Sequence, residues 1–449
     1  MAATREAYVV VDLGFGDAGK GTLTDFLVRR RGAHAVVRFN GGAQAGHNVV
    51  APDGRHHTFA QFGAGTFCEG VRTVLAAPVV VHPTALLAEA RWLERAGVRD
   101  PLDRVSVSAS CRVVTPFHQA ASRLRELARG DARHGSCGVG VGEVMADEAA
   151  GHGAVRAGEL LDATALRRAL AGVQARKRAE LDDIVRALRG VAGAAAEVEA
   201  LESGEVTDRW IEALAPWRAR GLGAGDGGLS AALAADGCVV FEGAQGALLD
   251  EWRGFHPHTT WSTCTFENAL DLLRGYDGDV RRLGVVRSYA TRHGAGPFPT
   301  EDRSLAGALD EPHNPAGAWQ GAFRVGWFDV ALLRYAMEVC GGVDGLAVTH
   351  LDRLGRVPRW GACVAYEGMA PWITDGALTP GPPRDLAWQE ALGHALRTAA
   401  PVYEALPEGV TAEGFVRWLE ARAGAAVWVA SEGPRAGDKR VLGGPAALR

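Results

Sequence analysis

The chain has 449 residues, of which 47% are hydrophobic and 22% charged, and its 48 basic and 53 acidic residues give a net charge of −5. This is the composition of an ordinary globular protein, and it excludes a chain that is disordered throughout. The small negative charge argues against an extended nucleic-acid surface. No apolar run reaches the roughly 18 residues of a membrane helix, and no signal-peptide pattern is present, so we expect a cytoplasmic protein. The seven cysteines are scattered singly, which indicates neither a disulfide framework nor a zinc site.

The first elements along the chain are a strand, a glycine-rich loop and a helix. The strand is predicted at residues 8–13, and the helix at residues 22–31, where Leu23, Phe26 and Leu27 are apolar. Further strands are predicted at residues 35–39, 79–81, 105–107, 239–241, 285–289 and 346–349. Alternation of strands and helices predicts the α/β class, with a large, mainly parallel sheet flanked by helices.

A long helix is predicted at residues 163–189, after Asp162, which is a suitable N-cap. Residues 221–228 and 379–383 are rich in glycine and proline and are expected to form loops. No internal repeat or long low-complexity linker divides the chain. We therefore expect a single domain over residues 1–449, with a helical insertion at about residues 160–235.

The strongest chemical signal is the loop Gly14–Thr22, between the first strand and the first helix. Backbone N–H groups and the dipole of a helix N-terminus favour a phosphate there, and Lys20 adds a point charge. The spacing differs from that of a Walker loop, and a generic glycine-rich turn is the simpler alternative. That alternative leaves Asp17 unexplained, because a carboxylate in an anion-binding loop is unfavourable unless it binds a metal or takes a proton.

A second segment, residues 39–48, follows the predicted strand at 35–39 and contains His47. A histidine on a loop is most often a surface residue. At the carboxyl edge of a parallel sheet, however, it would lie where ligands of open α/β folds bind.

These motifs resemble those of the adenylosuccinate synthetase family. Residues 16–21, Gly-Asp-Ala-Gly-Lys-Gly, resemble the family signature Gly-Asp-Glu-Gly-Lys-Gly, and residues 37–48 resemble its Gly-Gly-His-Asn-Ala-Gly-His-Thr. The resemblance continues, in the family's order, through residues 241–246, 288–301, 349–352 and 431–434. It implies the family's fold, with a P-loop-type GTP site. It also implies a two-step reaction, in which GTP phosphorylates O6 of inosine monophosphate (IMP) and an amine then displaces phosphate at C6.

The resemblance also implies roles for the matching residues. Asp17 would be the general base that takes the N1 proton and, with Gly46, a ligand of Mg²⁺, whereas His47 would be the general acid. Asp352 would bind the guanine edge, beside His350 where the family has lysine. The GTP site would comprise Gly16, Gly19, Lys20, Gly21, Asn48, His350, Asp352, Ser431, Gly433 and Pro434. The purine nucleotide would contact Gln44, Ser136, Cys137, Gln245 and Thr260. Taken singly, several of these side chains have ordinary structural explanations, such as a buried amide at Gln245 or a helix N-cap at Asp352.

The loop that would bind the amine substrate departs from the family. The family's run of arginines, which grips both carboxylates of aspartate, is replaced by residues 318–327, in which only Arg324 remains. Arginine binds carboxylates bidentately, so this loss disfavours aspartate. Trp319, Gln320 and Phe323 would instead suit an uncharged or bulkier amine, and an amino sugar is one candidate; Trp319 and Phe323 could equally be core residues.

A second departure lies at residues 135–140, where Cys137 replaces a threonine of the family while Ser136 keeps a hydroxyl. Gln44 stands where the family has asparagine. The arginine that a neighbouring subunit lends to the nucleotide in the family would fall near His152. A homodimer is expected, although the partner's contribution to the site is an open question.

Three functions therefore compete. The first is a GTP-dependent ligase that joins a non-aspartate amine to a 6-oxopurine nucleotide in a specialised biosynthetic pathway. The second is an ordinary adenylosuccinate synthetase with a rebuilt aspartate loop, and the third is a catalytically silent nucleotide-binding protein. The identity of the amine, the nucleotide and the pathway cannot be deduced from the sequence.

Overall fold

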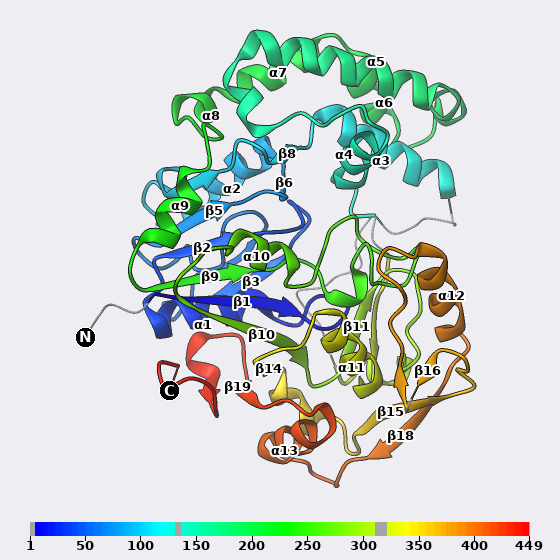
Figure 1. Ribbon diagram of the computed structural model, residues 1–449. Coiled ribbons are helices and arrows are strands. Elements are labelled where there is room, and N and C mark those ends of the chain that lie inside the picture. Colours follow the sequence, from blue (N-terminus) through cyan, green and yellow to red (C-terminus); the bar gives the residue numbers. More distant parts are fainter. Residues whose placement is uncertain (1–4, 131–135, 310–320, 375, 449) are drawn as a thin grey trace.

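A computed structural model describes residues 5–130, 136–309, 321–374 and 376–448. Its centre is a nine-stranded sheet in the order β20-β19-β14-β10-β1-β9-β2-β5-β7, in which only the edge strand β20 is antiparallel to its neighbour (Figure 1). The strands are β1 (Glu6–Asp12), β2 (Ala35–Arg38), β5 (Arg72–Leu75), β7 (Val105–Val107), β9 (Cys238–Glu242), β10 (Asp279–Arg287), β14 (Gly345–Thr349), β19 (Val427–Ser431) and β20 (Lys439–Val441). The predicted mainly parallel α/β sheet is confirmed.

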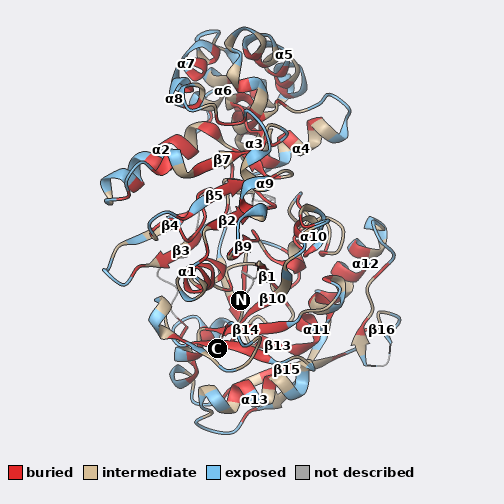
Figure 2. Ribbon diagram, turned by 60° about the vertical axis from the view of Figure 1, so that its left-hand side comes forward, coloured by how far each residue is buried: buried red, intermediate tan, exposed pale blue. Residues whose placement is uncertain are grey.

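The central strands are buried on both faces, as Figure 2 shows for the middle of the sheet. Every residue of β1 is buried, and Val9 pairs with Phe241 on one side and with Arg282 on the other. Because both faces are covered, these strands are continuous apolar runs, which is why the sequence reveals them.

Helices cover the sheet and its edges, and a further group lies apart from it. The helices are α1 (Lys20–Arg31), α2 (Pro83–Arg95), α3 (Pro116–Arg129), α4 (Val141–Ala149), α5 (Ala163–Leu188), α6 (Ala195–Glu202), α7 (Glu205–Ala213), α8 (Ala215–Ala219), α9 (Gly227–Ala234), α10 (Glu267–Leu272), α11 (Val330–Val339), α12 (Leu386–Leu396) and α13 (Ala412–Ala423). Helices α3 to α7 gather at the top of Figure 1, beyond the edge strand β7. Asp162 caps α5 as predicted, since its carboxylate accepts from the amides of Thr164 and Ala165.

Short ribbons complete the fold. They are β3 (His47–Val50) with β4 (His56–Phe59), β6 (Val80–Val81) with β8 (Arg112–Val113), β11 (Ala290–His293) with β12 (Phe323–Gly326), β16 (Ile373–Thr374) with β17 (Ala377–Leu378), and β13 (Phe328–Asp329) with β15 (Gly361–Glu367) and β18 (Ala400–Ala405).

Two of the expected elements need correction. Residues 79–81 were expected in the main sheet, but β6 pairs with β8 in a separate two-stranded ribbon. The strand expected at 285–289 begins at Asp279 and ends at Arg287. The prediction missed its first half because exposed and half-buried polar residues there hide the apolar pattern.

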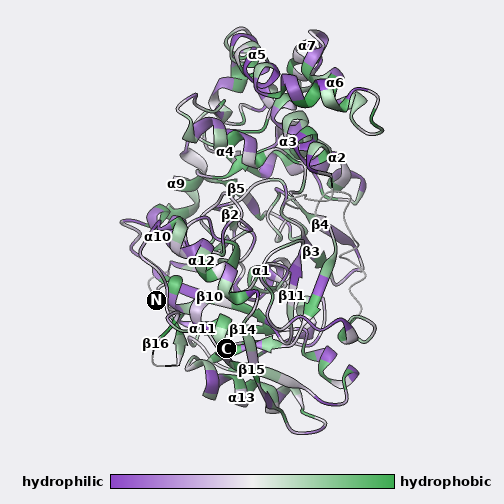
Figure 3. Cartoon of the chain, turned by 90° about the vertical axis from the view of Figure 1, so that its right-hand side faces the viewer, coloured by the Kyte–Doolittle hydropathy of each residue, from purple (hydrophilic) through white to green (hydrophobic). Residues whose placement is uncertain are grey.

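The helical group is amphipathic and tied together by charge. Figure 3 shows hydrophilic and hydrophobic residues side by side on α5 and α7. Lys177 lies on the buried face of α5, and its ammonium donates to Asp147 at 2.6 Å, to Glu180 at 3.0 Å and to Glu143 at 3.1 Å. This network fixes α4, which follows the Ser136–Cys137 segment. No helix in the described ranges is long and apolar enough to cross a membrane, and all seven cysteines have free thiols.

Candidate active site

The phosphate loop is held in shape by Asp12, the last residue of β1. Its carboxylate accepts from the amides of Gly14 at 2.8 Å and Ala18 at 2.9 Å, and from the Lys20 ammonium at 3.0 Å. Lys20, which is only 4% exposed, also donates to the carbonyl of Gln245 at 2.6 Å. The sequence did not single out Asp12, although its place at the end of the strand was a usable signal.

Asp17 lies at the tip of this loop with a φ of 59°, between Gly16 at 94° and Gly19 at 90°. Arg287 donates to the Asp17 carbonyl at 2.9 Å, and the Asp17 carboxylate lies 3.4 Å from Nε2 of His293. Burial raises the pKa of Asp17, and the neighbouring His293 and Lys20 partly oppose this effect. A raised pKa brings the carboxyl group closer to the range in which it can act as a base near neutral pH.

His47, at the start of β3, is buried and paired with a second carboxylate. Its Nδ1 lies 2.7 Å from Oε1 of Glu242, at the end of β9, whose other oxygen accepts from the Ala64 amide at 3.0 Å. Burial lowers the pKa of His47 to about 4, although Glu242 acts in the opposite direction. At neutral pH the imidazole is therefore uncharged, with Nδ1–H donating to Glu242. An anionic ligand beside it is needed before His47 can act as an acid.

Gly21 permits this arrangement, because a Cβ at that position would lie 2.7 Å from the Cβ of His47. The first turn of α1 and the start of β3 can therefore lie against each other only with glycine here. The sequence analysis did not single out Glu242 either: it occurs inside the recognised 241–246 segment, but its contact with His47 spans 195 positions of the chain.

The residues expected around the guanine base lie beyond β14 and β19. His350 has a φ of 59°, and its Nδ1 lies 2.8 Å from Oγ1 of Thr349. Burial and nearby cations lower its pKa well below the usual value. The Asp352 carboxylate is 3.2 Å from Nε of Arg353, and burial raises its pKa.

The loop after β19 is joined to the phosphate-loop helix. Lys439 donates to Oγ1 of Thr22 at 2.6 Å and to the carbonyls of Arg435 at 2.9 Å and Gly433 at 3.4 Å. Thr22 in turn donates to the Pro434 carbonyl, while Ser431 donates to the Gly433 carbonyl at 3.1 Å. The structure thus brings Ser431, Gly433 and Pro434 next to α1, as the sequence predicted for one nucleotide site.

The residues expected at the purine nucleotide are less uniform. The side chain of Gln245 lies over Gly41, and the buried Oε1 atoms of Gln44 and Gln245 have no hydrogen-bond partner in the described part of the chain. Such orphaned acceptors point to a ligand or water. By contrast, Thr260 is held by its amide, which donates to the Leu249 carbonyl at 2.8 Å. The side-chain oxygen of Asn48, expected at the GTP site, already accepts from Oγ1 of Thr58.

Ser136 and Cys137 precede α4; Oγ of Ser136 accepts from the Gly138 amide at 3.4 Å, and burial raises the pKa of the Cys137 thiol. The exposed backbone of Gly46, the second expected metal ligand, comes immediately before His47. The described residues contain no group of three or more ligating side chains. A single carboxylate with backbone oxygens nevertheless fits Mg²⁺, which usually takes its remaining ligands from water and substrate phosphates.

The loop expected to bind the amine is described only from Gly321 onward, so Trp319 and Gln320 lie outside the described residues. Phe323 and Arg324 begin β12, which pairs with β11. All three nitrogens of Arg324 donate to the protein: Nε and Nη2 donate to Oε2 of Glu301 at 2.9 and 2.7 Å, and Nη1 donates to the carbonyls of Gly294 and Gly296 at 2.9 and 3.1 Å.

Arg292, on β11, is also committed to the protein itself. It is 2% exposed and donates to the carbonyls of Ala295, Pro297 and His258 at 2.9–3.1 Å. Its guanidinium lies 4.2 Å from the centre of the Phe15 ring, and burial lowers its pKa to about 9. Neither arginine is therefore available to a substrate carboxylate without breaking these bonds.

A family model described as adenylosuccinate synthetase matches residues 9–439. The chain belongs to the adenylosuccinate synthetase family. It is 32% identical to an adenylosuccinate synthetase of Neisseria gonorrhoeae, covering 99% of this chain and all of the relative, and 34% identical to that of Methylococcus capsulatus, covering 98% of each. The fully ligated adenylosuccinate synthetase of Plasmodium falciparum has the same fold, with a TM-score of 0.76 at 21% identity over 97% of this chain and 99% of the other. The succinoaminodeoxyadenylate synthetase of cyanophage S-2L is more distant, with a TM-score of 0.54 at 17% identity over 98% and 95% of the chains.

Membership confirms the predicted fold and the predicted class of enzyme, a GTP-dependent ligase that forms a C–N bond. Residues of the family's motifs lie at one edge of the sheet in this chain. Asp17 follows β1, His47 lies beyond the end of β2, and Glu242 is the last residue of β9, the strand between β1 and β2.

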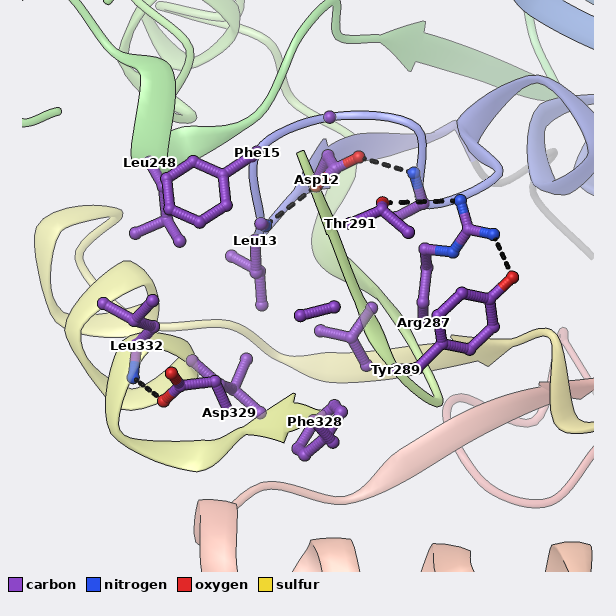
Figure 4. A pocket seen from close by; sticks show the side chains of 16 residues that line it. Asp12, Leu13, Phe15, Leu248, Arg287, Tyr289, Thr291, Phe328, Asp329 and Leu332 are labelled. Atoms are coloured by element: carbon purple, nitrogen blue, oxygen red, sulfur yellow. Dashed lines mark hydrogen bonds between the residues drawn. The ribbon is translucent and has the colours of Figure 1, made fainter. Parts of the chain in front are cut away.

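A small cavity of about 60 Å³ lies behind the phosphate loop (Figure 4). It is mostly apolar, bounded by Phe15, Leu248 and Phe328 among others, and it is too small for a nucleotide. On one wall Asp329 caps α11 by accepting from the Leu332 amide at 2.9 Å, and burial raises its pKa to about 6. On another wall, Arg287 donates to the hydroxyl of Tyr289 and to the carbonyl of Asp17. The residues around the cavity therefore help to hold the loop in place.

Proposed function

We propose that this chain uses GTP to phosphorylate O6 of IMP and then joins an amine other than aspartate to C6. The observation that carries the proposal is the Arg324–Glu301 pair. Where the family uses arginines to bind a dicarboxylate, the one that remains here has both outer nitrogens and Nε committed to a carboxylate and two carbonyls of the protein.

The cost of admitting aspartate supports this choice. A substrate carboxylate would have to displace Glu301 from Arg324 or enter without a cation, and each charge-assisted hydrogen bond is worth about 1.5–3 kcal/mol. The wall instead offers the ring of Phe323 and the half-buried Glu301 carboxylate. An apolar face and a hydrogen-bond acceptor suit an amine with hydroxyl groups, and an amino sugar is the concrete candidate.

The phosphoryl-transfer half of the reaction is supported by the Asp17 and His47 geometry. Asp17 takes the N1 proton, which makes O6 nucleophilic, and His47 is held by Glu242 to face the phosphates. Mg²⁺, held by the Asp17 carboxylate and the Gly46 carbonyl, would neutralise phosphate charge when bound. Retention of Asp17, together with a buried His47–Glu242 pair, argues against a silent nucleotide-binding protein.

The second candidate is ordinary adenylosuccinate synthesis from aspartate, which the family's named relatives favour. The choice of purine is part of the same proposal, since the cyanophage relative is described as bound to dGMP, with dATP as an energy donor. Asp352 supports GTP as the donor, because a carboxylate accepts from both N1–H and the amino group of guanine. The proposal also includes that the protein is a homodimer and acts in the cytoplasm, in a specialised biosynthetic pathway.

Two measurements test the proposal. Scrambling of an isotopically labelled bridge oxygen of GTP in the presence of IMP, without any amine, reports reversible phosphoryl transfer. A panel of amines, including aspartate and amino sugars, followed by product mass then identifies the nucleophile. If aspartate gave the highest specificity constant of all amines in the panel, with adenylosuccinate as the product, the proposal of an amine other than aspartate would be refuted.

A further inference from the structure

His293 is the described side chain that joins the catalytic carboxylate to the wall of the amine site. It is the last residue of β11, and its register partner on β12 is Phe323. Its ring contacts the Phe323 ring edge to face, with centroids 4.7 Å apart, while Nε2 lies 3.4 Å from the Asp17 carboxylate. One ring therefore touches the residue of the first chemical step and a residue of the amine loop.

The other ring nitrogen has no explained role. Nδ1 of His293 is buried and has no hydrogen-bond partner among the described residues, although the side chain as a whole is 22% exposed. A buried polar atom without a partner is unfavourable, so a ligand that supplies a hydrogen-bond donor would recover that cost. With Nε2–H directed at the carboxylate, the tautomer leaves a lone pair on Nδ1.

We propose that His293 positions both reactants: Nε2 orients the Asp17 carboxylate for proton removal from the purine, and Nδ1 accepts a hydrogen bond from the attacking amine. This inference rests on the proposed function. It deepens that function by assigning the recognition of the nucleophilic nitrogen to a residue that neither the motif resemblance nor the spacing singled out.

The second step balances without any further reactant. The nitrogen lone pair forms the C6–N bond, the C6–O bond breaks, and its electron pair leaves with phosphate. The proton that the nitrogen loses goes to the departing phosphate. A hydrogen bond from a second N–H to Nδ1 directs the lone pair toward C6 throughout, so His293 acts as an acceptor and need not change its charge.

Two conservative variants separate the two contacts. The amide of glutamine reaches the position of Nε2, and the shorter asparagine places its amide near that of Nδ1. His293→Gln therefore keeps a donor for Asp17 and loses the acceptor for the amine, whereas His293→Asn does the reverse. His394→Gln is the matched control, because His394 is exposed on α12.

The readout is a ratio, so that partial loss of folded protein does not affect it. Each variant is assayed with GTP and IMP for bridge-oxygen scrambling, and then with hydroxylamine as a small nucleophile that needs no specific pocket. The ratio of hydroxylamine adduct to scrambling measures the amine step alone. We expect His293→Gln to lower this ratio about tenfold at near-normal scrambling, and His293→Asn to lower scrambling about tenfold at an unchanged ratio.

Equal ratios in the two variants, or a parallel loss of both activities in each, would overturn the assignment of His293 while leaving the proposed function in place. Absence of scrambling in the unmodified, folded protein would instead remove the proposed function, and the role of His293 with it.

Discussion

The pairing of His47 with Glu242 makes a quantitative prediction about the phosphoryl-transfer step. Glu242→Gln removes a buried negative charge but keeps the shape of the side chain and an oxygen that can still accept from Nδ1. The loss is therefore the difference between a charged and a neutral acceptor at 2.7 Å, about 1–1.5 kcal/mol. Because 1.36 kcal/mol corresponds to a factor of ten, bridge-oxygen scrambling should slow about tenfold.

The same substitution should lower stability, and the two effects can be separated. Arg38, which is 2% exposed, has its Nε 4.0 Å from the second Glu242 oxygen and would lose its opposite charge. We expect a fall of about 1–3 kcal/mol in the free energy of unfolding, measured with urea. Scrambling is then measured well below the melting temperature, with the affinity for GTP as the control. A rate equal to that of the unmodified enzyme in fully folded protein would show that Glu242 does not support His47.

Four further predictions follow from single contacts. Asp17→Asn, which fits the positive φ, should slow scrambling about 100-fold or more while GTP still binds; normal turnover would contradict the role of Asp17 as base. Asp352→Asn should reduce the preference for GTP over other triphosphates in competition assays, and unchanged selectivity would remove its assignment to guanine. The double substitution Ala322→Arg and Phe323→Arg should raise the specificity constant for aspartate. Gly321 is left unchanged because its φ of 79° would strain an arginine there. No gain in the specificity constant would show that missing arginines do not explain poor use of aspartate. Asp329 has its pKa raised from 3.8 to about 6, so the folded state holds its proton more tightly and stability from this group falls as pH rises through 6. Relative to the unmodified chain, Asp329→Asn should therefore gain about 2.5 kcal/mol of unfolding free energy between pH 4 and pH 7, and urea titrations with parallel pH dependence would contradict it.

The parts of the molecule that the sequence predicted are those with local causes. The strand, glycine turn and helix around Lys20 depend on neighbouring residues, and the buried strands are visible because both faces are apolar. Strand β5 (Arg72–Leu75) and strand β19 (Val427–Ser431) escaped prediction, being short runs whose burial depends on distant neighbours. The division into one domain with a helical insertion stays a prediction.

Site residues were predicted where the family resemblance assigns a role to the matching position, as it does for Asp17 and His47. Glu242 and His293 lie in recognised segments too, but they were missed because their contacts are with residues far away in the chain. Arg324 illustrates the limit most clearly: the sequence shows that it is present, but its commitment to Glu301 exists only in the folded protein.

The Asp12 carboxylate holds the phosphate loop in shape without a nucleotide, so at the proposed GTP site phosphate binding would be a displacement reaction. An incoming phosphate would compete with the Asp12 carboxylate and the Gln245 carbonyl for the protons of Lys20. Little chain entropy is lost on binding, because the loop is already ordered, but the electrostatic gain is reduced by the partners that Lys20 gives up. The same exchange would run in reverse when GDP leaves the proposed site, since Lys20 would return to partners that are already in place. The resting Lys20–Asp12 ion pair is therefore expected to favour release of the product.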